Sequence, residues 1–155
     1  MTQTDLTPLA GRWTGRGHGD YPTIEAFDYL ETITVTASPK GFFAYQQTTK
    51  HPETGFPMHS EMGYFRPGAD GAAELLLAQP NGIAELHTGH VTSGPDGWHA
   101  VFRTTTVGRT ATAKQVDAVE RRLTVSGDVL TYEVDMGAVG QPLQLHLTAA
   151  LQREA

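Results

Sequence analysis

Short runs of alternating apolar and polar residues fill most of the chain, separated by breaks rich in glycine. β-Branched and aromatic residues cluster in these runs and a 3.6-residue period is rare, which favours strands over helices. The breaks combine Gly with Pro, Asn or Asp, the residues suited to tight turns. They fall at 38–41, 51–55, 67–71, 80–82, 93–97 and 126–128.

Ten strands are predicted between these breaks. Their ranges are 11–18, 26–37, 41–50, 58–66, 73–79, 82–92, 97–106, 116–125, 128–136 and 142–152. Loops this short join sequential neighbours as antiparallel hairpins. Because an open sheet of ten such strands would leave two bare edges, we expect it to close. The sequence therefore predicts an all-β, up-and-down antiparallel barrel with room for a ligand, and a β-sandwich is the alternative.

Two stretches fit this pattern less well. Thr23–Phe27, after Pro22, could form a short helical turn, and Thr110–Val116 reads equally as a loop or a helical turn. Neither changes the fold class. We expect residues 1–155 to form a single domain.

Composition limits the function classes. Hydrophobic residues make up 39% of the chain and no apolar run approaches the roughly 20 residues of a membrane span. The start of the chain lacks the features of a signal peptide, so we expect a cytoplasmic protein. The absence of cysteine excludes disulfides, thiolate catalysis and covalent haem attachment. A net charge of -6, with no basic cluster beyond Arg121-Arg122, argues against nucleic-acid binding.

The first strand has glycine at alternate positions, including Gly15, Gly17 and Gly19. Such a strand has one face without side chains, which permits close approach by a flat ligand or by another backbone. Alternatively, the glycines let the strand bend while Trp13 plugs the bottom of the barrel. Because no helix follows, the segment is not a dinucleotide fingerprint.

Histidines are the candidate ligands, and His146 in the last strand is the first of them. Strict alternation would place His146 on the face opposite four leucines. These leucines are Leu143, Leu145, Leu147 and Leu151. If the leucine face is the core, His146 lies outside; if the other face lines a cavity, His146 can bind a ligand. Periodicity leaves both interpretations open.

Other histidines are weaker candidates. His59, at the start of a strand beside Met58, could face a ligand or be an exposed polar residue. His87 and His90 are three residues apart in a predicted strand, so they point to opposite faces and form a poor metal pair.

Six separated segments occur in an order that is typical of one family. They are GRWTGRG at 11–17, YPTI at 21–24, FDYLETI at 27–33, PMHSE at 57–61, AQPNGIAEL at 78–86, and a Met–His spacing of ten from Met136 to His146. With these segments the chain resembles the nitrobindins from about Leu9 to Arg153. Nitrobindins are haem-binding β-barrels related in shape to the fatty-acid-binding proteins of the calycin group.

The resemblance implies a set of site residues. The iron of a noncovalent b-type haem would be bound by His146, and the haem pocket would be lined by Thr23, His59, Gln79 and Met136. Lys114 is a candidate partner for a haem propionate because of its charge and its position in a loop. His18 matches no fixed histidine of the family and is expected at the surface.

The resemblance also implies an enzyme. A ferric haem at the barrel mouth would convert peroxynitrite to nitrate and bind nitric oxide reversibly. No anionic partner for His146 is evident, so its imidazole should be a modest donor to the iron. Expected partners are small molecules, and the protein would be a monomer or a homodimer.

Two alternatives remain. One is a non-catalytic haem or nitric oxide carrier or sensor. The other is a haem-free barrel for apolar ligands, which would aim arginines at a carboxylate. The candidates for that role are Arg103, Arg109, Arg121 and Arg122.

Overall fold

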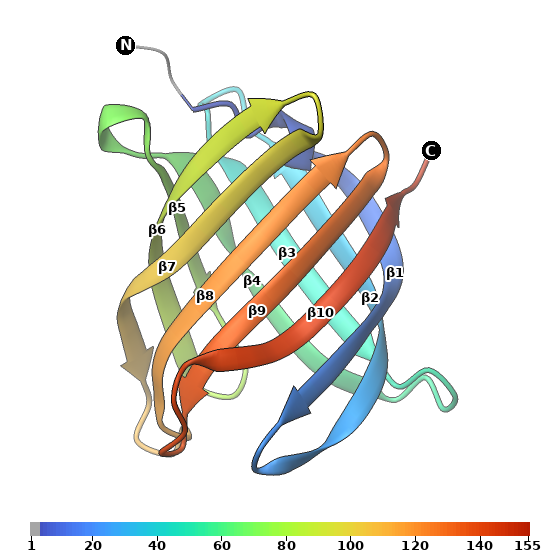
Figure 1. Cartoon of the computed structure of the whole chain (residues 1–155), viewed down its shortest axis with the longest axis vertical. Coiled ribbons are helices and arrows are strands. Elements are labelled where there is room, and N and C mark those ends of the chain that lie inside the picture. Colours follow the sequence, from blue (N-terminus) through green and yellow to red (C-terminus); the bar gives the residue numbers. More distant parts are fainter. Residues whose placement is uncertain (1–3) are drawn as a thin grey trace.

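The computed structural model describes residues 4–155, whose strands follow one another around a closed barrel (Figure 1). The strands are Gly11–Tyr21 (β1), Ile24–Ala37 (β2), Phe43–Lys50 (β3), Pro57–Pro67 (β4), Ala73–Ala78 (β5), Ile83–Gly94 (β6), Gly97–Arg109 (β7), Val116–Ser126 (β8), Val129–Ala138 (β9) and Gln144–Arg153 (β10). Each pairs antiparallel with its sequence neighbours, and β1 pairs with β10 to close the barrel. The predicted ten-stranded up-and-down barrel is confirmed, and the sandwich alternative is wrong.

The two doubtful stretches both connect strands. The helical turn considered at Thr23–Phe27 is wrong, because β1 ends at Tyr21 and β2 begins at Ile24, leaving a two-residue turn between them. The stretch before Val116 is a loop. Helix in the described residues is limited to two short 3-10 turns, Thr7–Leu9 (η1) and Ala69–Gly71 (η2). Across residues 4–155, no helix has the length and apolar character needed to cross a membrane.

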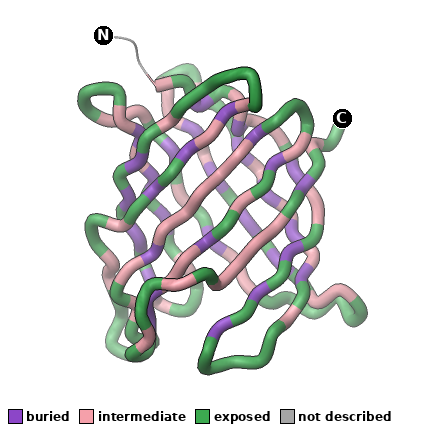
Figure 2. The backbone as a smooth tube through the Cα atoms, in the orientation of Figure 1, coloured by how far each residue is buried: buried purple, intermediate pink, exposed green. Residues whose placement is uncertain are grey.

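One end of the barrel is closed by an apolar core. Buried and exposed positions alternate along the strands that surround it (Figure 2). Trp13 is fully buried there, and its indole N–H donates to the carbonyl of Leu9 in η1 at 2.9 Å. The indole of Trp98 donates to the carbonyl of Asp5 at 2.8 Å, so the segment before β1 is tied across this end. The predicted plug at Trp13 is confirmed.

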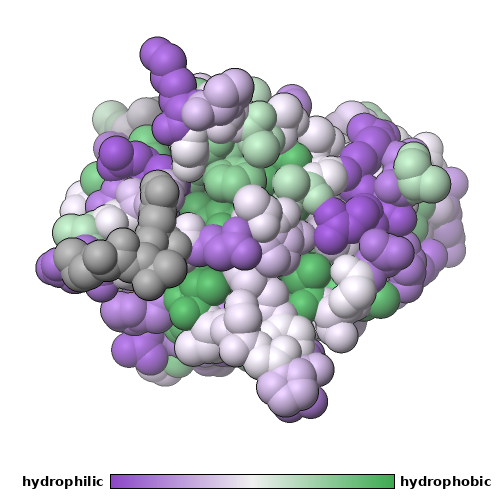
Figure 3. All heavy atoms as spheres, turned by 90° about the horizontal axis from the view of Figure 1, so that it is seen from above, coloured by the Kyte–Doolittle hydropathy of each residue, from purple (hydrophilic) through white to green (hydrophobic). Residues whose placement is uncertain are grey.

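Figure 3 looks onto this closed end, where apolar side chains lie between hydrophilic ones. Leu6 and Leu9, from the segment that crosses it, are each 1% exposed. Full burial of one such side chain contributes about 1.5–3 kcal/mol. Leu6 and Leu9 are therefore part of the core.

The glycines of β1 accommodate aromatic rings of the same chain. A Cβ atom at Gly17 would stand 2.1 Å from the Tyr29 ring, and one at Gly19 would stand 2.2 Å from the Phe27 ring. At Gly15 it would stand 2.1 Å from the carbonyl oxygen of Ala150. The expected close approach therefore occurs, by a backbone at Gly15 and by two rings of β2 at Gly17 and Gly19.

Candidate functional site

A cavity of about 630 Å³ opens at the end of the barrel opposite η1. Its size falls in the range of roughly 300–1,000 Å³ that is typical of small-molecule and cofactor pockets. It is lined by all six residues that the sequence analysis selected. These are Thr23, His59, Gln79, Lys114, Met136 and His146. The barrel brings them together from six separate segments; their contact with a haem stays a prediction.

His146 enters the cavity because β10 contains a β-bulge. Leu145 pairs with Asp135 and Leu147 with Val134, so His146 is an extra residue without a partner on β9. A bulge changes which face the following side chains occupy. His146 and Leu147 accordingly both line the cavity, whereas Leu145 is 50% exposed on the outside. The expectation that four leucines share one face is wrong, since Leu143 and Leu145 lie outside and Leu147 and Leu151 inside.

Three neighbours hold the His146 ring. Its Nδ1–H donates to the backbone carbonyl of Asp20 at 3.0 Å, which fixes the tautomer. The lone pair of Nε2 is therefore free to coordinate a metal. The Tyr21 ring packs edge-on with its centroid 5.2 Å away, and the Phe27 centroid lies at 6.5 Å. Burial lowers the pKa of His146, and the nearby His59 lowers it further. The imidazole is therefore neutral at physiological pH.

These properties fit the axial ligand of a haem iron. Metal-binding histidines are neutral and usually give their second ring N–H to a carbonyl or a carboxylate. A carbonyl partner polarises the ring less than a carboxylate would, in line with the expected modest donor. The same cavity is lined by the other five residues named above.

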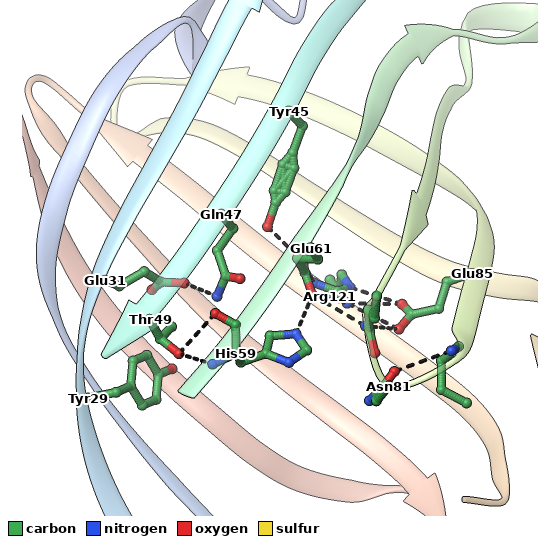
Figure 4. A network of polar contacts seen from close by, with 12 residues as sticks. Tyr29, Glu31, Tyr45, Gln47, Thr49, His59, Glu61, Asn81, Glu85 and Arg121 are labelled. Carbon is green, nitrogen blue, oxygen red and sulfur yellow. Dashed lines mark hydrogen bonds and ion pairs between the residues drawn. The ribbon is translucent and has the colours of Figure 1, made fainter. Parts of the chain in front are cut away.

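Below the cavity mouth, a layer of buried polar side chains crosses the barrel (Figure 4). We call it the polar belt. It consists of Tyr29, Glu31, Tyr45, Gln47, Glu61, Gln79, Glu85, His87, Arg121 and Tyr132. The belt was not predicted from the sequence. Of its members, Gln79 was expected in the haem pocket, and Arg121 was considered for fatty-acid recognition.

One half of the belt is built around Arg121. Its guanidinium donates hydrogen bonds to Glu61 at 2.8 Å and to Glu85 at 3.0 Å. Glu61 also accepts from the Tyr45 hydroxyl at 2.7 Å, and His59 Nε2 lies 3.2 Å from it. Burial alone would raise the pKa of Glu61, but the Arg121 charge and these hydrogen bonds outweigh it and hold the pKa well below its usual range. Glu61 is thus a firmly ionised carboxylate.

The other half is built around Glu31. The Tyr132 hydroxyl donates to Glu31 Oε1 and the Gln47 amide donates to Oε2, both at 2.7 Å. The hydroxyls of Tyr29 and Tyr132 are also 2.7 Å apart. Burial raises the pKa of Glu31 to about 7, although these hydrogen bonds lower it. With Arg121 committed to the other two glutamates, Glu31 is the belt carboxyl that can exchange a proton near neutral pH.

The geometry disfavours the fatty-acid type of barrel. Of the four arginines considered for that role, Arg121 alone lines the cavity, and its donors are engaged by Glu61 and Glu85. Arg122 pairs with Asp135, and Arg103 with Glu120. His18 is exposed and pairs with Asp28, as expected of a surface histidine.

The chain is similar to known proteins over almost its whole length. Residues 3–153 match the family model described as "THAP4-like, heme-binding beta-barrel domain". The chain is 48% identical to peroxynitrite isomerase 2 of Mycobacterium avium, over 96% of this chain and 92% of that protein. It is 44% identical to peroxynitrite isomerase of Nocardia farcinica, over 96% of this chain and 89% of that protein. The crystal structure of Rv2717c from M. tuberculosis superposes with a TM-score of 0.94 at 43% identity, covering 97% of this chain and 95% of that one.

The fold and the site define a haem-binding β-barrel as the class of protein. The chain belongs to the THAP4-like haem-binding β-barrel family, and the predicted resemblance to the nitrobindins is confirmed. The names of the curated relatives agree with the expectation of an enzyme.

Proposed function

We propose that this protein is a haem-dependent peroxynitrite isomerase that holds its haem through His146. Bound haem, held by His146, would supply the iron chemistry that converts peroxynitrite to nitrate. The observation that carries the proposal is the bulge in β10, which turns a neutral imidazole with a fixed tautomer into the cavity. The names of the relatives support the choice of reaction.

Residues around His146 hold its imidazole in place for the haem. Asp20 and the rings of Tyr21 and Phe27 keep the His146 imidazole in one orientation, so little side-chain freedom is lost on binding. The proposed haem is a noncovalent b-type haem, since the chain has no cysteine for covalent attachment.

The remaining predicted residues have different roles at the rim. Lys114, in the loop before β8, would pair with a propionate, and Thr23 and Met136 would contact the macrocycle. His59 and Gln79 are both hydrogen-bonded to Glu61, which restrains them on the wall of the cavity. We further propose that the resting iron is ferric, because a site at an open mouth is partly solvated, and that it binds nitric oxide reversibly.

A hemin titration tests the assignment of the ligand. The wild-type chain should develop a Soret band with a saturating stoichiometry of about one haem per chain, and His146→Ala should lose it. His90→Ala is the matched control, because His90 is exposed on the outer face of β6. A spectrum in His146→Ala equal to that of the control would remove His146 from the iron.

Stopped-flow decay of peroxynitrite tests the reaction. The ferric hemin-loaded protein should accelerate the decay and raise the yield of nitrate, whereas the free chain should not. Normal hemin binding without acceleration would contradict the enzyme and leave a haem or nitric oxide carrier.

A further inference from the structure

Two tyrosines of the polar belt are hydrogen-bonded in series to one carboxyl. Tyr132 lies 2.7 Å from Glu31, to which it donates, so in the 2.7 Å contact between the two hydroxyls Tyr29 is the donor. Burial raises the pKa of both tyrosines well above the ordinary value, so neither loses a proton on its own. The proposed isomerase reaction uses none of these three groups.

An aromatic contact path joins this pair to the axial histidine. The Phe27 centroid lies 6.5 Å from that of His146 and 6.0 Å from that of Tyr29. Gly17 leaves room for the Tyr29 ring and Gly19 for the Phe27 ring, because a Cβ atom at either position would overlap the ring beside it. The alternate glycines of β1 thus fix a path from the haem ligand to the tyrosine pair.

The carboxyl at the end of this path is suited to accept a proton. Glu31 faces Tyr132 from β9, Gln47 from β3, Tyr29 on its own strand, and the charged groups Glu61 of β4 and Arg121 of β8. Burial holds its pKa at about 7, so at neutral pH a large fraction is carboxylate that can take up a proton.

A second buried tyrosine provides a contrast within the same belt. Tyr45 donates to Glu61 at 2.7 Å, the same distance as in the Tyr132–Glu31 pair. Arg121 keeps the pKa of Glu61 well below its usual range, so Glu61 is a very weak base. Tyr45 therefore has no neighbour that can accept its proton on oxidation, whereas Tyr132 has Glu31.

We propose that Tyr132, supported by Tyr29, is a redox-active tyrosine that gives one electron to an oxidant formed in the haem pocket while its proton moves to Glu31. The Tyr132 O–H bond breaks, an O–H bond forms on Glu31, and a neutral phenoxyl radical remains that accepts the hydrogen bond of Tyr29. This activity rests on the proposed haem site at His146.

The oxidant arises from a hydroperoxide that enters the haem pocket. Hydrogen peroxide needs two electrons and two protons to become two waters, and each step supplies one electron from Tyr132 and one proton through Glu31. Between the steps a one-electron donor from solution, of the phenol class, returns the phenoxyl radical to tyrosine with one electron and one proton. The protein would thereby carry a tyrosine-dependent peroxidase activity in addition to isomerisation.

Electron paramagnetic resonance of freeze-quenched samples tests the proposal. Ferric hemin-loaded protein is mixed with hydrogen peroxide at pH 8, and ring-deuterated tyrosine identifies the radical by its altered hyperfine pattern. The wild type should give a tyrosyl signal, and Tyr132→Phe and Glu31→Gln should reduce it at least tenfold. Tyr45→Phe, which removes one buried hydroxyl beside a glutamate, should keep it. In the wild type the yield should fall between pH 8 and pH 6, as Glu31 becomes protonated.

Hemin spectra of every variant are recorded first, so that loss of the cofactor is separated from loss of the radical. Equal signals in Tyr132→Phe and wild type, or no tyrosyl signal in a wild type that binds haem through His146, would overturn the redox role and leave the isomerase intact. If the spectrum of bound hemin does not depend on His146, the proposed function fails, and the redox role of Tyr132 fails with it.

Discussion

At the scale of single residues, Glu31 and Glu61 show how neighbours decide the protonation of identical side chains. Both are about equally buried, and both accept a tyrosine hydroxyl at 2.7 Å. The difference is Arg121, whose guanidinium bonds Glu61 directly and compensates its charge. Burial without such a partner disfavours the ionised carboxylate, so Glu31 titrates near neutrality whereas Glu61 stays charged.

The free energy of unfolding should therefore depend on Glu31. Its pKa rises from 4.5 to about 7 on folding, so the folded state binds the proton more tightly. The stabilisation that results is complete below pH 4.5 and is lost as the pH rises to 7. Glu31→Gln mimics the protonated side chain, so it should match the wild type at pH 4.5. At pH 8 it should be more stable by up to about 3 kcal/mol, at about 1.4 kcal/mol per pKa unit.

Urea unfolding of the haem-free chain at pH 4.5 and pH 8 measures this difference. Glu25→Gln, which changes an exposed glutamate, is the control and should show the same pH dependence as the wild type. A stability difference between Glu31→Gln and wild type that is equal at both pH values would contradict the assignment.

At the scale of single elements, β10 shows where a sequence pattern stops being sufficient. Alternation predicted the strand and its bounds to within two residues, since it covers Gln144–Arg153. The extra residue at His146 depends on pairing with β9, a contact between segments that alternation within one strand does not encode. Periodicity therefore left the orientation of His146 open, and the resemblance to a known family supplied it.

The polar belt escaped prediction for a different reason. Glu31 stands in the inward phase of β2, two residues from Tyr29 and from Ile33, and this spacing was its available signal. Its partners come from other strands, and charged residues inside a barrel are expected only when such partners exist. Local sequence cannot show that Arg121 meets Glu61 and Glu85.

The glycine pattern of β1 leads to a prediction for this element. Gly19→Ala should push the Phe27 ring away from β1 and disturb the contact of Phe27 with His146. Overpacking of this kind costs about 1–3 kcal/mol of unfolding free energy, and hemin affinity should fall several-fold. Gly94→Ala in β6 is the matched control, because a Cβ atom there meets nothing within 4 Å.

Thermal unfolding and hemin titration of both variants provide the measurements. Equal melting temperatures and equal hemin affinities for Gly19→Ala and Gly94→Ala would show that the Phe27 ring does not need the bare backbone of β1.

At the scale of the whole molecule, the barrel has three layers along its axis. The closed end holds an apolar core around Trp13, the polar belt crosses the middle, and His146 lies toward the open end. The cavity extends from His146 past the belt and reaches core residues such as Leu9 and Leu130. Turn spacing and alternation predicted the closed sheet, with a β-sandwich as the alternative, because an open sheet of ten antiparallel strands would leave two bare edges. The layering arises from which side chains face inward at each level of the barrel.

This layering predicts an uneven resistance to local opening. The loops and strand ends at the cavity mouth are largely exposed, whereas Trp13 and Phe102 are fully buried, and local stability follows packing. In the haem-free chain, amides of 20–28, 110–115 and 139–147 should therefore exchange hydrogen faster than those around Trp13. Hemin should slow exchange in these three segments in the wild type and leave it unchanged in His146→Ala, because a ligand protects only the states that bind it. Mass spectrometry of exchanged peptides measures both effects. Uniform protection in the haem-free barrel, or slowing by hemin that survives the loss of His146, would contradict a cavity built around that histidine.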